Sequence, residues 1–453
     1  MSEQKFAYDV SSPKSIENHA KKLENKSFRE ALDGLVIREK GNKGGLGQLL
    51  EKSHFGYEIN SNAEPDFEEA GVELKTTPYI YRSKNRPVAK ERLVLNIIDY
   101  MTLPHEKFEN SSFWKKNQTL LLIFYLHQAK DVIPNRLDYQ ITHAQLFQFP
   151  EKDLKIIKAD WEKIVEKVRQ GKAHELSEGD TNYLGACTKG ANKYSHRPQP
   201  YSDEYAMQRA FSLKTSYMTT VLNHYILPGK KTYHESILEE NDLGEDTLES
   251  FILKKFNRFS GMSVDTIMSE VGEEVESKPK HFTARVASKM LNLDDRLEKT
   301  EEFRKANIKV KNITVSKKGK VKESMSFPAF KYKELIKEEW DSSTLREMFL
   351  NTRFLFVVFR YNEHNELFFE KALFWNIPHN DLEIEVREVW DETINRIKDG
   401  ECRNLPTASE NPVAHVRPHA QNKQDTYETP QGDHVVKKSF WLNNKYIEQQ
   451  IGL

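Results

Sequence analysis

The chain has 453 residues, of which 38% are hydrophobic and 30% are charged, and its formal net charge is −1 at pH 7. This composition is typical of a folded globular protein and excludes a disordered one, and the length predicts two or more domains. A net charge near zero neither supports nor excludes nucleic acid as a ligand, because acidic surfaces elsewhere can balance a basic cleft.

Cysteine usage and the absence of targeting signals narrow the class of protein further. The two cysteines, Cys187 and Cys402, show no CxxC spacing, which argues against a zinc ribbon or a disulfide scaffold. The first residues lack the basic-then-apolar pattern of a secretion signal, and no apolar run approaches the length of a membrane span. We therefore expect a reduced, cytoplasmic protein without a membrane partner.

The N-terminal part predicts helices separated by a glycine-rich turn. Residues 12–36 are predicted to be helical, with Ser12 as N-cap and Pro13 in the first turn. Glycines then recur over residues 41–47, and a second helix is expected to begin over residues 48–52. Such a turn can hold phosphate on backbone N–H groups, but no Walker pattern is present, so we do not expect a nucleotide pocket.

The next segment carries the clearest chemical signal. Asp66 follows a proline in a predicted loop, and residues 72–76 alternate as a short strand. Because side chains alternate between the two faces of a strand, Glu73 and Lys75 point the same way. If Asp66 folds back beside Glu73, two carboxylates and one ammonium converge, as is required to hold a hard divalent cation and a water against a phosphodiester. The alternative is an exposed ion pair of little energetic value.

Further elements of the first half follow in order. A buried strand is predicted over residues 91–98, and the continuous apolar run 119–126 predicts a central strand covered on both faces. Residues 160–171 predict an amphipathic helix with a glycine stop. Residues 181–199 are predicted to form a polar, basic loop, and residues 211–225 a strand that runs into a helix.

An internal repeat relates the two halves of the chain. Residues of the first half recur 229 positions later, in the pairs Trp161/Trp390, Val165/Ile394, Val168/Ile397, Gly171/Gly400, Leu176/Leu405, Phe211/Phe440, Leu213/Leu442 and Tyr217/Tyr446. The strand 120–126 has a counterpart over residues 354–359, and residues 189–192 correspond to residues 419–422 with an offset one residue longer. The sequence thus predicts two copies of one α/β domain, roughly residues 1–230 and 235–453.

The second copy is expected to lack the catalytic residues. We place residues 325–330 opposite the strand that carries Glu73 and Lys75, and that segment has neither glutamate nor lysine. The preceding residues 309–322 are rich in lysine. A catalytic copy followed by a DNA-binding copy is the expected organisation.

These motifs together resemble the MutH family, the strand-nicking endonucleases of mismatch repair. The whole chain looks still more like the two-domain type II restriction endonucleases related to MutH that cleave at GATC. The resemblance rests on Lys43-Gly44-x-x-Gly47-x-Leu49-Leu50-Glu51, Pro65-Asp66-Phe67, Gly71-Val72-Glu73-Leu74-Lys75 and Lys189-x-Ala191-Asn192, in that order along the chain.

The resemblance implies a fold and a set of site residues. It implies two tandem restriction-endonuclease-like (PD-ExK) domains, each a central mixed β-sheet flanked by helices. Asp66, Glu73 and Lys75 would form the catalytic core, and Glu51 would assist at the metal site. MutH carries a tyrosine where this chain has Ser212, so sensitivity to adenine methylation does not carry over.

The expected chemistry is metal-dependent hydrolysis of a DNA phosphodiester. Asp66, Glu73 and the carbonyl of Leu74 would hold Mg²⁺, which lowers the pKa of a bound water. Lys75 would orient or deprotonate the attacking water, or neutralise charge in the transition state. Glu51 would hold a second ion or the water, unless it is an ordinary surface carboxylate.

Several polar residues are candidates for DNA contact, since each phosphate that a cation neutralises adds salt-sensitive affinity. The alternative for any single lysine is simple solvation, and His415 and His419 at i,i+4 spacing would also suit a metal pair. The position of the two histidines in the repeat favours polar contacts instead. The candidates are Lys43, Lys116, Lys189, Asn192 and Arg197 in the first copy and Arg417 and His419 in the second.

The sequence therefore predicts a bacterial, cytoplasmic type II restriction endonuclease that cuts double-stranded DNA at GATC with Mg²⁺. Its second domain would bind DNA as an allosteric effector, the enzyme would dimerise on DNA, and a DNA methyltransferase would be its counterpart in the host. The alternatives are a mismatch-repair-type protein that nicks or only binds GATC DNA and, ranked last, a metal-dependent phosphatase.

Overall fold

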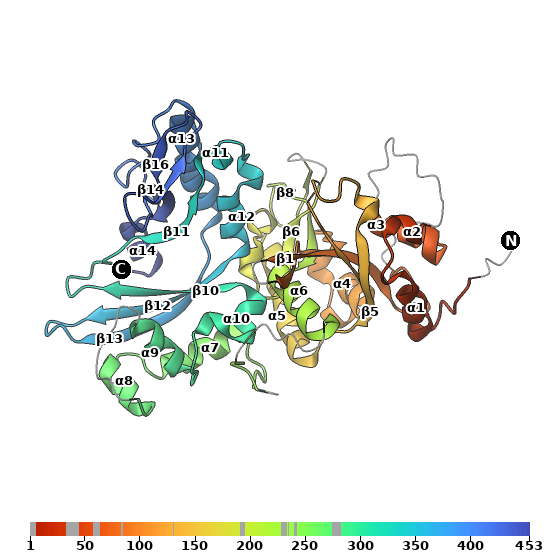
Figure 1. The fold of residues 1–453 in the computed structure, drawn as a ribbon. Helices are drawn as coiled ribbons and strands as arrows, with labels where there is room; N and C mark the ends of the chain where they lie inside the picture. The colour runs from red at the N-terminus through yellow and green to blue at the C-terminus, as the bar shows by residue number, and fades with distance from the viewer. Residues whose placement is uncertain are drawn as a thin grey trace. The chain divides into compact units, whose positions relative to one another are not determined.

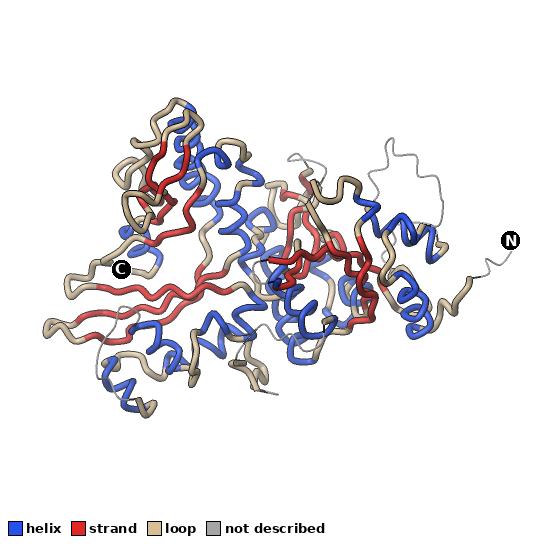
Figure 2. Tube along the Cα trace, viewed as in Figure 1, coloured by secondary structure: helices blue, strands red, loops and turns tan. Residues whose placement is uncertain are grey.

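The computed structural model describes residues 6–32, 45–57, 64–82, 85–129, 131–190, 195–227, 233, 235–239, 242–273 and 282–453. Its strands form several mixed or antiparallel sheets, and helices pack beside them (Figures 1 and 2). The chain divides into two compact units. Unit 1 comprises Met1–Thr247 together with Thr300–Asn307, and unit 2 comprises Leu248–Lys299 and Ile308–Leu453.

In its described residues, unit 1 has two main sheets and the small two-stranded sheet β7-β8. The larger has the order β2-β1-β4-β5, in which β1 and β4 are parallel and the other neighbours are antiparallel. The smaller sheet, β3-β9-β6, is antiparallel throughout. The strands are β1 Glu73–Arg82, β2 Arg86–Ala89, β3 Leu93–Ile97, β4 Leu120–Leu126, β5 Gln140–Phe147, β6 Leu184–Thr188, β7 His196–Arg197, β8 Ala206–Met207 and β9 Arg209–Leu213.

Helices cover these sheets. The predicted central strand is confirmed, because residues 120–124 of β4 are buried on both faces. One face of the larger sheet packs against α1, α2 and α3 through a continuous apolar core that includes Leu74 of β1. The helices are α1 Pro13–Ala20, α2 Phe28–Ala31, α3 Leu46–Leu50, α4 Ser112–Asn117, α5 Glu151–Arg169, α6 Thr215–Val221 and α10 Glu301–Ala306.

Some predicted boundaries are wrong, for identifiable reasons. Residues 12–36 do not form one helix: α1 starts at the predicted Ser12 N-cap, but Asn25 adopts φ +66° and donates its N–H to β5. A capping box at Ser27 then starts α2. Helix α5 begins at Glu151, nine residues before its predicted start, and ends as expected before Gly171, whose φ is +69°.

The region predicted as a polar, basic loop contains a buried strand. Four of the five residues of β6 are buried, and Asp160 of α5 accepts hydrogen bonds from the backbone N–H groups of Asn182, Tyr183 and Leu184. The buried strand predicted over residues 91–98 is β3, which is only partly buried and belongs to the smaller sheet. The strand-to-helix prediction for residues 211–225 is confirmed by β9 and α6.

Unit 2 has sheets of the same order and direction. Strand β10 is parallel to β12, which is antiparallel to β13, and the second sheet has the order β11-β17-β14 (Figure 2). Helices α7, α8 and α9 lie along one side of the first sheet (Figure 1). The strands are β10 Ile308–Val315, β11 Met325–Phe330, β12 Arg353–Tyr361, β13 Leu367–Trp375, β14 Ala414–Pro418, β15 Thr426–Glu428, β16 His434–Val436 and β17 Lys438–Leu442. The helices are α7 Leu248–Asn257, α8 Val264–Glu270, α9 Phe282–Met290, α11 Tyr332–Leu335, α12 Thr344–Asn351, α13 Arg387–Lys398 and α14 Asn444–Gln450.

Strand pairing corrects one equivalence drawn from the sequence. Residues 325–330 were placed opposite the strand of Glu73 and Lys75, but they form β11, which pairs with β17 as β3 pairs with β9. The strand in the position of β1 is β10, because β10 is parallel to β12 as β1 is parallel to β4.

The short segment 300–307 belongs to unit 1 through a buried ionic network. The ammonium of Lys305 lies 2.6 Å and 2.8 Å from the two carboxylate oxygens of Asp153 in α5, and 2.6 Å from Glu301. Tyr217 donates a further hydrogen bond to Asp153. Burial alone would lower the pKa of Lys305, but the two carboxylates outweigh it and raise that pKa above its usual value.

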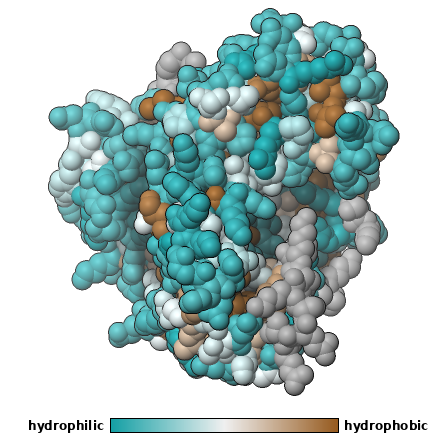
Figure 3. All heavy atoms as spheres, turned by 90° about the vertical axis from the view of Figure 1, so that its left-hand side faces the viewer, coloured by the Kyte–Doolittle hydropathy of each residue, from teal (hydrophilic) through white to brown (hydrophobic). Residues whose placement is uncertain are grey.

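The described helices include none that is long and apolar enough to cross a membrane. The face drawn in Figure 3 is mostly hydrophilic, with hydrophobic side chains in small separate areas. A surface of this kind suits contact with water and with charged ligands.

The Lys305 network yields a stability prediction. Replacing Lys305 by methionine leaves Asp153, which is 1% exposed, as a buried charge without its main partner, so we expect unit 1 to lose about 3–5 kcal/mol of unfolding free energy. Urea unfolding of the full chain, followed by intrinsic fluorescence, measures the loss. Arg29→Met removes the exposed pair with Asp138 and should cost about 0.5 kcal/mol at most. Equal losses of unfolding free energy in the two variants would contradict the stabilising role of the buried Lys305 network.

Candidate active site

A tight loop brings two carboxylates together at the start of β1. Phe67 and Val72 exchange backbone hydrogen bonds of 2.9 Å and 3.2 Å, and Gly71 between them adopts φ +63°, a conformation that favours glycine. The loop returns Asp66 to the strand, where its N–H donates to Glu73 Oε2 over 3.1 Å. In turn, Asp66 Oδ2 accepts the N–H of Leu74 over 2.9 Å. The structure thus places Asp66 beside Glu73.

Two lysines flank Glu73 on the same side. Lys75 Nζ lies 2.6 Å from Glu73 Oε1, and Lys116 Nζ of α4 lies 3.8 Å from the same oxygen. Leu74 points to the opposite face and packs into the core with α1–α3, as the alternation of β1 requires. Two carboxylates and two ammonium groups therefore meet on the face of β1 opposite to Leu74 and the apolar core.

Strand β1 has different neighbours along its length. Strand β2 pairs with Tyr79–Arg82, whereas along Glu73–Lys75 the described residues give β1 one paired strand, β4. The side chain of Glu73 itself is nearly buried, whereas that of Lys75 is 18% exposed. Of the two side chains, that of Lys75 is therefore the one that a ligand contacts first.

Glu51 approaches the cluster from a different element. It begins the π-helical turn Glu51–Phe55 that follows α3. A Cβ on Gly47 of α3 would lie 3.1 Å from Thr76 Oγ1 of β1, so the glycine allows α3 to approach the strand closely. This close approach carries Glu51 into the field of Asp66 and Glu73.

The electrostatics show an excess of negative charge. Burial, and then the charge of Asp66, raise the pKa of Glu51 to about 7, against the opposing effect of Lys75. Burial also raises the pKa of Glu73, with Lys75 opposing and Asp66 adding to the shift. Carboxylates that repel one another in a partly buried site become more stable when a cation binds between them.

The residues fit a hard divalent cation. Within the described ranges no group of three His, Cys, Asp or Glu side chains forms a ready-made metal cage. Mg²⁺, however, usually keeps several waters and takes only one or two carboxylates from the protein. Asp66 and Glu73, with the backbone carbonyl of Leu74 between them in sequence, supply that donor set. The chemistry of the donors and the raised carboxyl pKa values both agree with such an ion.

The remaining candidates from the sequence are placed as follows. Lys189 is exposed immediately after β6, and its N–H donates to Gln208 over 2.7 Å; Arg197 is exposed in β7. Lys43 and Asn192 lie outside the described residues. In unit 2, Arg417 and His419 are exposed at the end of β14, and the guanidinium of Arg417 lies 3.7 Å from the ring centre of Trp441.

The histidine alternative is not supported. His415 is buried and its ring lies 2.5 Å from Asn443 Oδ1, whereas His419 is exposed. Both rings lie near Trp441, with ring centres 6.4 Å and 5.5 Å from that of the indole, so polar and ring contacts account for the two histidines.

Sequence reasoning missed the support behind the catalytic loop. His19 and His54 stack with ring centres 4.3 Å apart, and each ring nitrogen lies 3.0–3.1 Å from the other residue's carbonyl oxygen. Burial lowers the pKa of His54 to about 4, against the opposing effect of its hydrogen bond to the His19 backbone, and this keeps His54 neutral. Tyr8 stacks on His19 and also contacts Phe67 of the loop. The 35 residues between the histidines leave no local signal for this contact.

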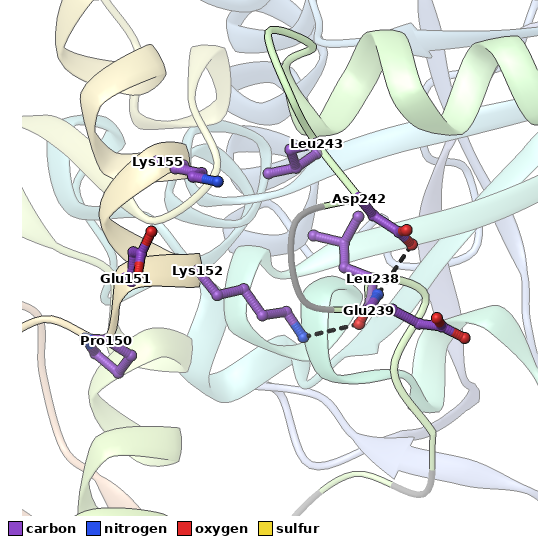
Figure 4. A pocket seen from close by; sticks show the side chains of 8 residues that line it. All are labelled: Pro150, Glu151, Lys152, Lys155, Leu238, Glu239, Asp242 and Leu243. Atoms are coloured by element: carbon purple, nitrogen blue, oxygen red, sulfur yellow. Dashed lines mark hydrogen bonds between the residues drawn. The ribbon is translucent and has the colours of Figure 1, made fainter.

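A separate hollow of about 330 Å³ in unit 1 is not the active site. It lies between the start of α5 and Leu238–Leu243, and its lining includes Lys152 and Lys155 (Figure 4). Lys152 is already engaged by Ser236, by the carbonyl of Leu238 and by Glu301 and Glu302. That lysine is committed to holding the segment 300–307 and is not available as a phosphate ligand.

Comparison with known proteins agrees with the geometry. Residues 55–160 match the family model described as DNA mismatch repair enzyme MutH, a range that includes Asp66, Glu73, Lys75 and Lys116. The chain is 36% identical to the type II restriction enzyme Sau3AI of Staphylococcus aureus, over 96% of this chain and 98% of that protein. It is 29% identical to the DNA mismatch repair protein MutH of Shewanella woodyi, over 41% of this chain and 78% of that protein, and 26% identical to MutH of Vibrio campbellii, over 44% and 88%.

The pKa of Glu51 predicts an unusual pH dependence of stability. The pKa of Glu51 is about 7 in the folded protein and about 4.3 in the unfolded chain. The protein therefore loses stability through this group as the pH rises from about 4.3 to about 7. Glu51→Gln should therefore stabilise the metal-free protein at pH 8 by about 1 kcal/mol, allowing for solvent screening, and change little at pH 4.5. Urea unfolding in chelator at the two pH values measures this. Exposed Glu69→Gln is the control, and an equal effect of Glu51→Gln at both pH values would contradict the assignment.

Proposed function

The chain belongs to the family of the type II restriction enzyme Sau3AI, and we propose that this DNA endonuclease cleaves both strands at GATC sites with Mg²⁺ as its cofactor. The observation that carries the proposal is the return of Asp66 to β1. Its backbone N–H donates to the carboxylate of Glu73, and the ammonium of Lys75 lies 2.6 Å from the same carboxylate. The choice of GATC rests on the resemblance of the motifs to the MutH-related restriction enzymes.

The residues of unit 1 divide the work of phosphodiester hydrolysis. Asp66, Glu73 and the Leu74 carbonyl would hold Mg²⁺, which when bound polarises the phosphoryl oxygens and lowers the pKa of a water. Lys75, beside Glu73, orients the attacking water and offsets the charge that develops on the phosphate. Lys116 adds a second ammonium 3.8 Å from Glu73. Glu51, with a pKa near 7, is suited to accept a proton at neutral pH.

DNA would lie along the open edge of β1. We assign backbone phosphate contacts to exposed cations of unit 1, and contacts within the groove to the loop that follows β6. The residues assigned to DNA are Lys43, Lys116, Lys189, Asn192 and Arg197 in the first half and Arg417 and His419 in the second.

We also propose that the chain is a tandem pair of PD-ExK domains, a catalytic one over residues 1–230 and an effector one over residues 235–453. The proposal is supported by the order and direction of the strands, which are the same in β1-β4-β5 and β10-β12-β13 and again in β3-β9-β6 and β11-β17-β14. DNA bound to the second domain would raise the activity of the first through a coupling free energy.

The partners follow from the chemistry. One set of Asp66, Glu73 and Lys75 hydrolyses one phosphodiester at a time, so we propose that two copies assemble on the DNA to cut both strands. A nuclease with a four-base site would also cut the DNA of its bacterial host. A cognate DNA methyltransferase in the same cytoplasm would protect those sites.

A specific observation favours a second candidate function. The match to the MutH model covers the whole catalytic loop, and the motifs resemble the strand-nicking endonucleases of mismatch repair. In this alternative the same residues nick GATC rather than cut it through, and the product distinguishes the two reactions.

DNA cleavage tests both the reaction and the sequence specificity. Incubation of a supercoiled circle that carries one GATC site should give linear DNA in Mg²⁺, none in chelator, and ends that sequence to GATC. Glu73→Ala should reduce the rate at least 1000-fold, because it removes the carboxylate that Asp66 and Lys75 share. The control Glu69→Ala alters an exposed residue of the same loop and should cut normally. Accumulation of nicked circles would favour the MutH-type reaction, and uncut DNA in Mg²⁺ and Mn²⁺ would overturn the proposal.

The second prediction concerns the effector role of unit 2. Deleting residues 235–453 is not a clean test, because Thr300–Asn307 complete unit 1. Arg417→Ala in the full chain should instead abolish the advantage of a two-site circle over a one-site circle, while Arg417→Lys, which keeps the charge but loses the planar stack on Trp441, should retain part of it.

Exposed Arg403→Ala is the matched control and should behave as the parent chain. Equal rates on one-site and two-site circles in the parent chain would remove the effector role, whatever the variants do.

A further inference from the structure

Strand register identifies which residues of unit 2 stand in the positions of the catalytic residues. A bulge interrupts β4 and β5 between Phe124 and Tyr125, and a bulge interrupts β12 and β13 between Val358 and Phe359. Glu73 pairs with the residue four positions before the first bulge, and Lys309 pairs with the residue four positions before the second. Lys309 therefore occupies the position of Glu73.

The same register carries the neighbouring positions. Lys75 pairs with Leu122, two residues before the bulge in β4, and Lys311 pairs with Phe356, two residues before the bulge in β12. The lysine of the catalytic strand is thus retained, and the glutamate is replaced by a second lysine. The expectation that unit 2 lacks a lysine opposite Lys75 is wrong. It takes residues 325–330, which form β11, as the counterpart of β1, whereas the strand register indicates β10.

A carboxylate also remains in the position of Asp66. Glu298 Oε1 accepts the N–H of Val310 over 3.0 Å, as Asp66 Oδ2 accepts the N–H of Leu74 over 2.9 Å. Val310 and Leu74 each pair with the residue three positions before the respective bulge. Three of the positions that build the catalytic cluster are therefore filled in unit 2, with one change in the sign of charge.

The change in sign alters which ligand the cluster can take. Asp66, Glu73 and Lys75 carry a net charge of −1, which becomes +1 when a divalent cation binds. Glu298, Lys309 and Lys311 carry +1 with no metal at all. The ammonium of Lys309 thus supplies in unit 2 the positive charge that a metal ion would supply in unit 1, and it repels such an ion.

The two lysines are held differently. Lys311 is partly buried, with its ammonium 3.4 Å from the carbonyl of Ser326 and 5.7 Å from the centre of the Phe327 ring. Lys309 is exposed on the same face of β10. On the side away from β12, described residues bond to the C-terminal end of β10, through the Val315–Val321 bridge and the N–H of Lys322, and an extended polyanion can approach that side of the strand beside the exposed Lys309.

We propose that Glu298, Lys309 and Lys311 form a metal-independent phosphate site in unit 2, which binds a backbone phosphodiester of DNA at the place where unit 1 holds the phosphate to be cut. Lys309 and Lys311 bind the phosphate oxygens through charge-assisted hydrogen bonds. Glu298 accepts the N–H of Val310, and its charge opposes the lowering of the Lys311 pKa that burial and the neighbouring Lys309 cause. This site rests on the proposed function, in which unit 2 binds DNA.

The test measures DNA binding by the full chain in chelator, in a Glu73→Ala background that does not cut. A short GATC duplex is titrated against the protein by calorimetry at several salt concentrations. We expect two distinct binding steps, with Lys309→Gln weakening one of them about tenfold and reducing its salt slope by about one. Lys317→Gln, which removes an exposed lysine from the turn after the same strand, should leave both steps unchanged.

The outcomes separate this proposal from the proposed function. If the parent chain shows a single binding step, unit 2 is not a DNA-binding domain and both proposals fall. If it shows two steps and Arg417→Ala weakens one of them, but Lys309→Gln and Lys311→Gln do not, the effector function stands and the phosphate site is overturned.

A charge reversal tests the register itself. Lys309→Glu restores the order of charges found in unit 1, so we expect one more Mn²⁺ bound per chain than in Lys309→Gln, and weaker DNA binding at unit 2 in chelator. Equal Mn²⁺ stoichiometry in the two variants would contradict the equivalence of Lys309 and Glu73.

Discussion

The structure of the active site depends on a pair of reciprocal hydrogen bonds between Asp66 and β1. The N–H of Asp66 donates to Glu73, and Asp66 accepts the N–H of Leu74, so the two carboxylates are held together although they repel each other. Burial is the main cause of the raised pKa values of Glu73 and Glu51, and the charge of Asp66 adds to both shifts. Without a bound cation, the ammonium of Lys75 is the main group that offsets the negative charge of the two carboxylates. The fold gains further stability when a divalent ion binds.

The rest of unit 1 holds this strained arrangement in place. Strand β4 anchors one side of β1, the stacked His19 and His54 support the loop from behind, and Gly47 lets α3 bring Glu51 close. The segment 300–307 reaches unit 1 from much later in the sequence and is fixed there by Lys305. The chain therefore leaves unit 1, returns to complete it, and enters β10 of unit 2 directly at Ile308. The catalytic unit is not separable by a single cut of the chain.

Local sequence patterns predicted the features that depend on neighbouring residues. Alternation placed Glu73 and Lys75 on one face, and the apolar run identified β4. The patterns failed where distant contacts decide the structure. Strand β6 is buried because Asp160 of α5 receives the backbone of the segment that leads into it, and the helix after α1 is broken because Asn25 bonds to β5. Self-comparison of the sequence failed for the same reason: most of the repeat keeps an offset of 229, but Lys309 lies 236 positions after Glu73, and only the paired strands show this.

The two units then illustrate how one strand can serve two kinds of phosphate chemistry. In unit 1 the charge that faces the phosphate would be a mobile ion held by carboxylates, which can activate a water. In unit 2 the same net charge is carried by the covalently fixed ammonium of Lys309, which can bind a phosphate but has no means of lowering the pKa of water. One change of side chain thus converts a site that cuts into a site that only holds.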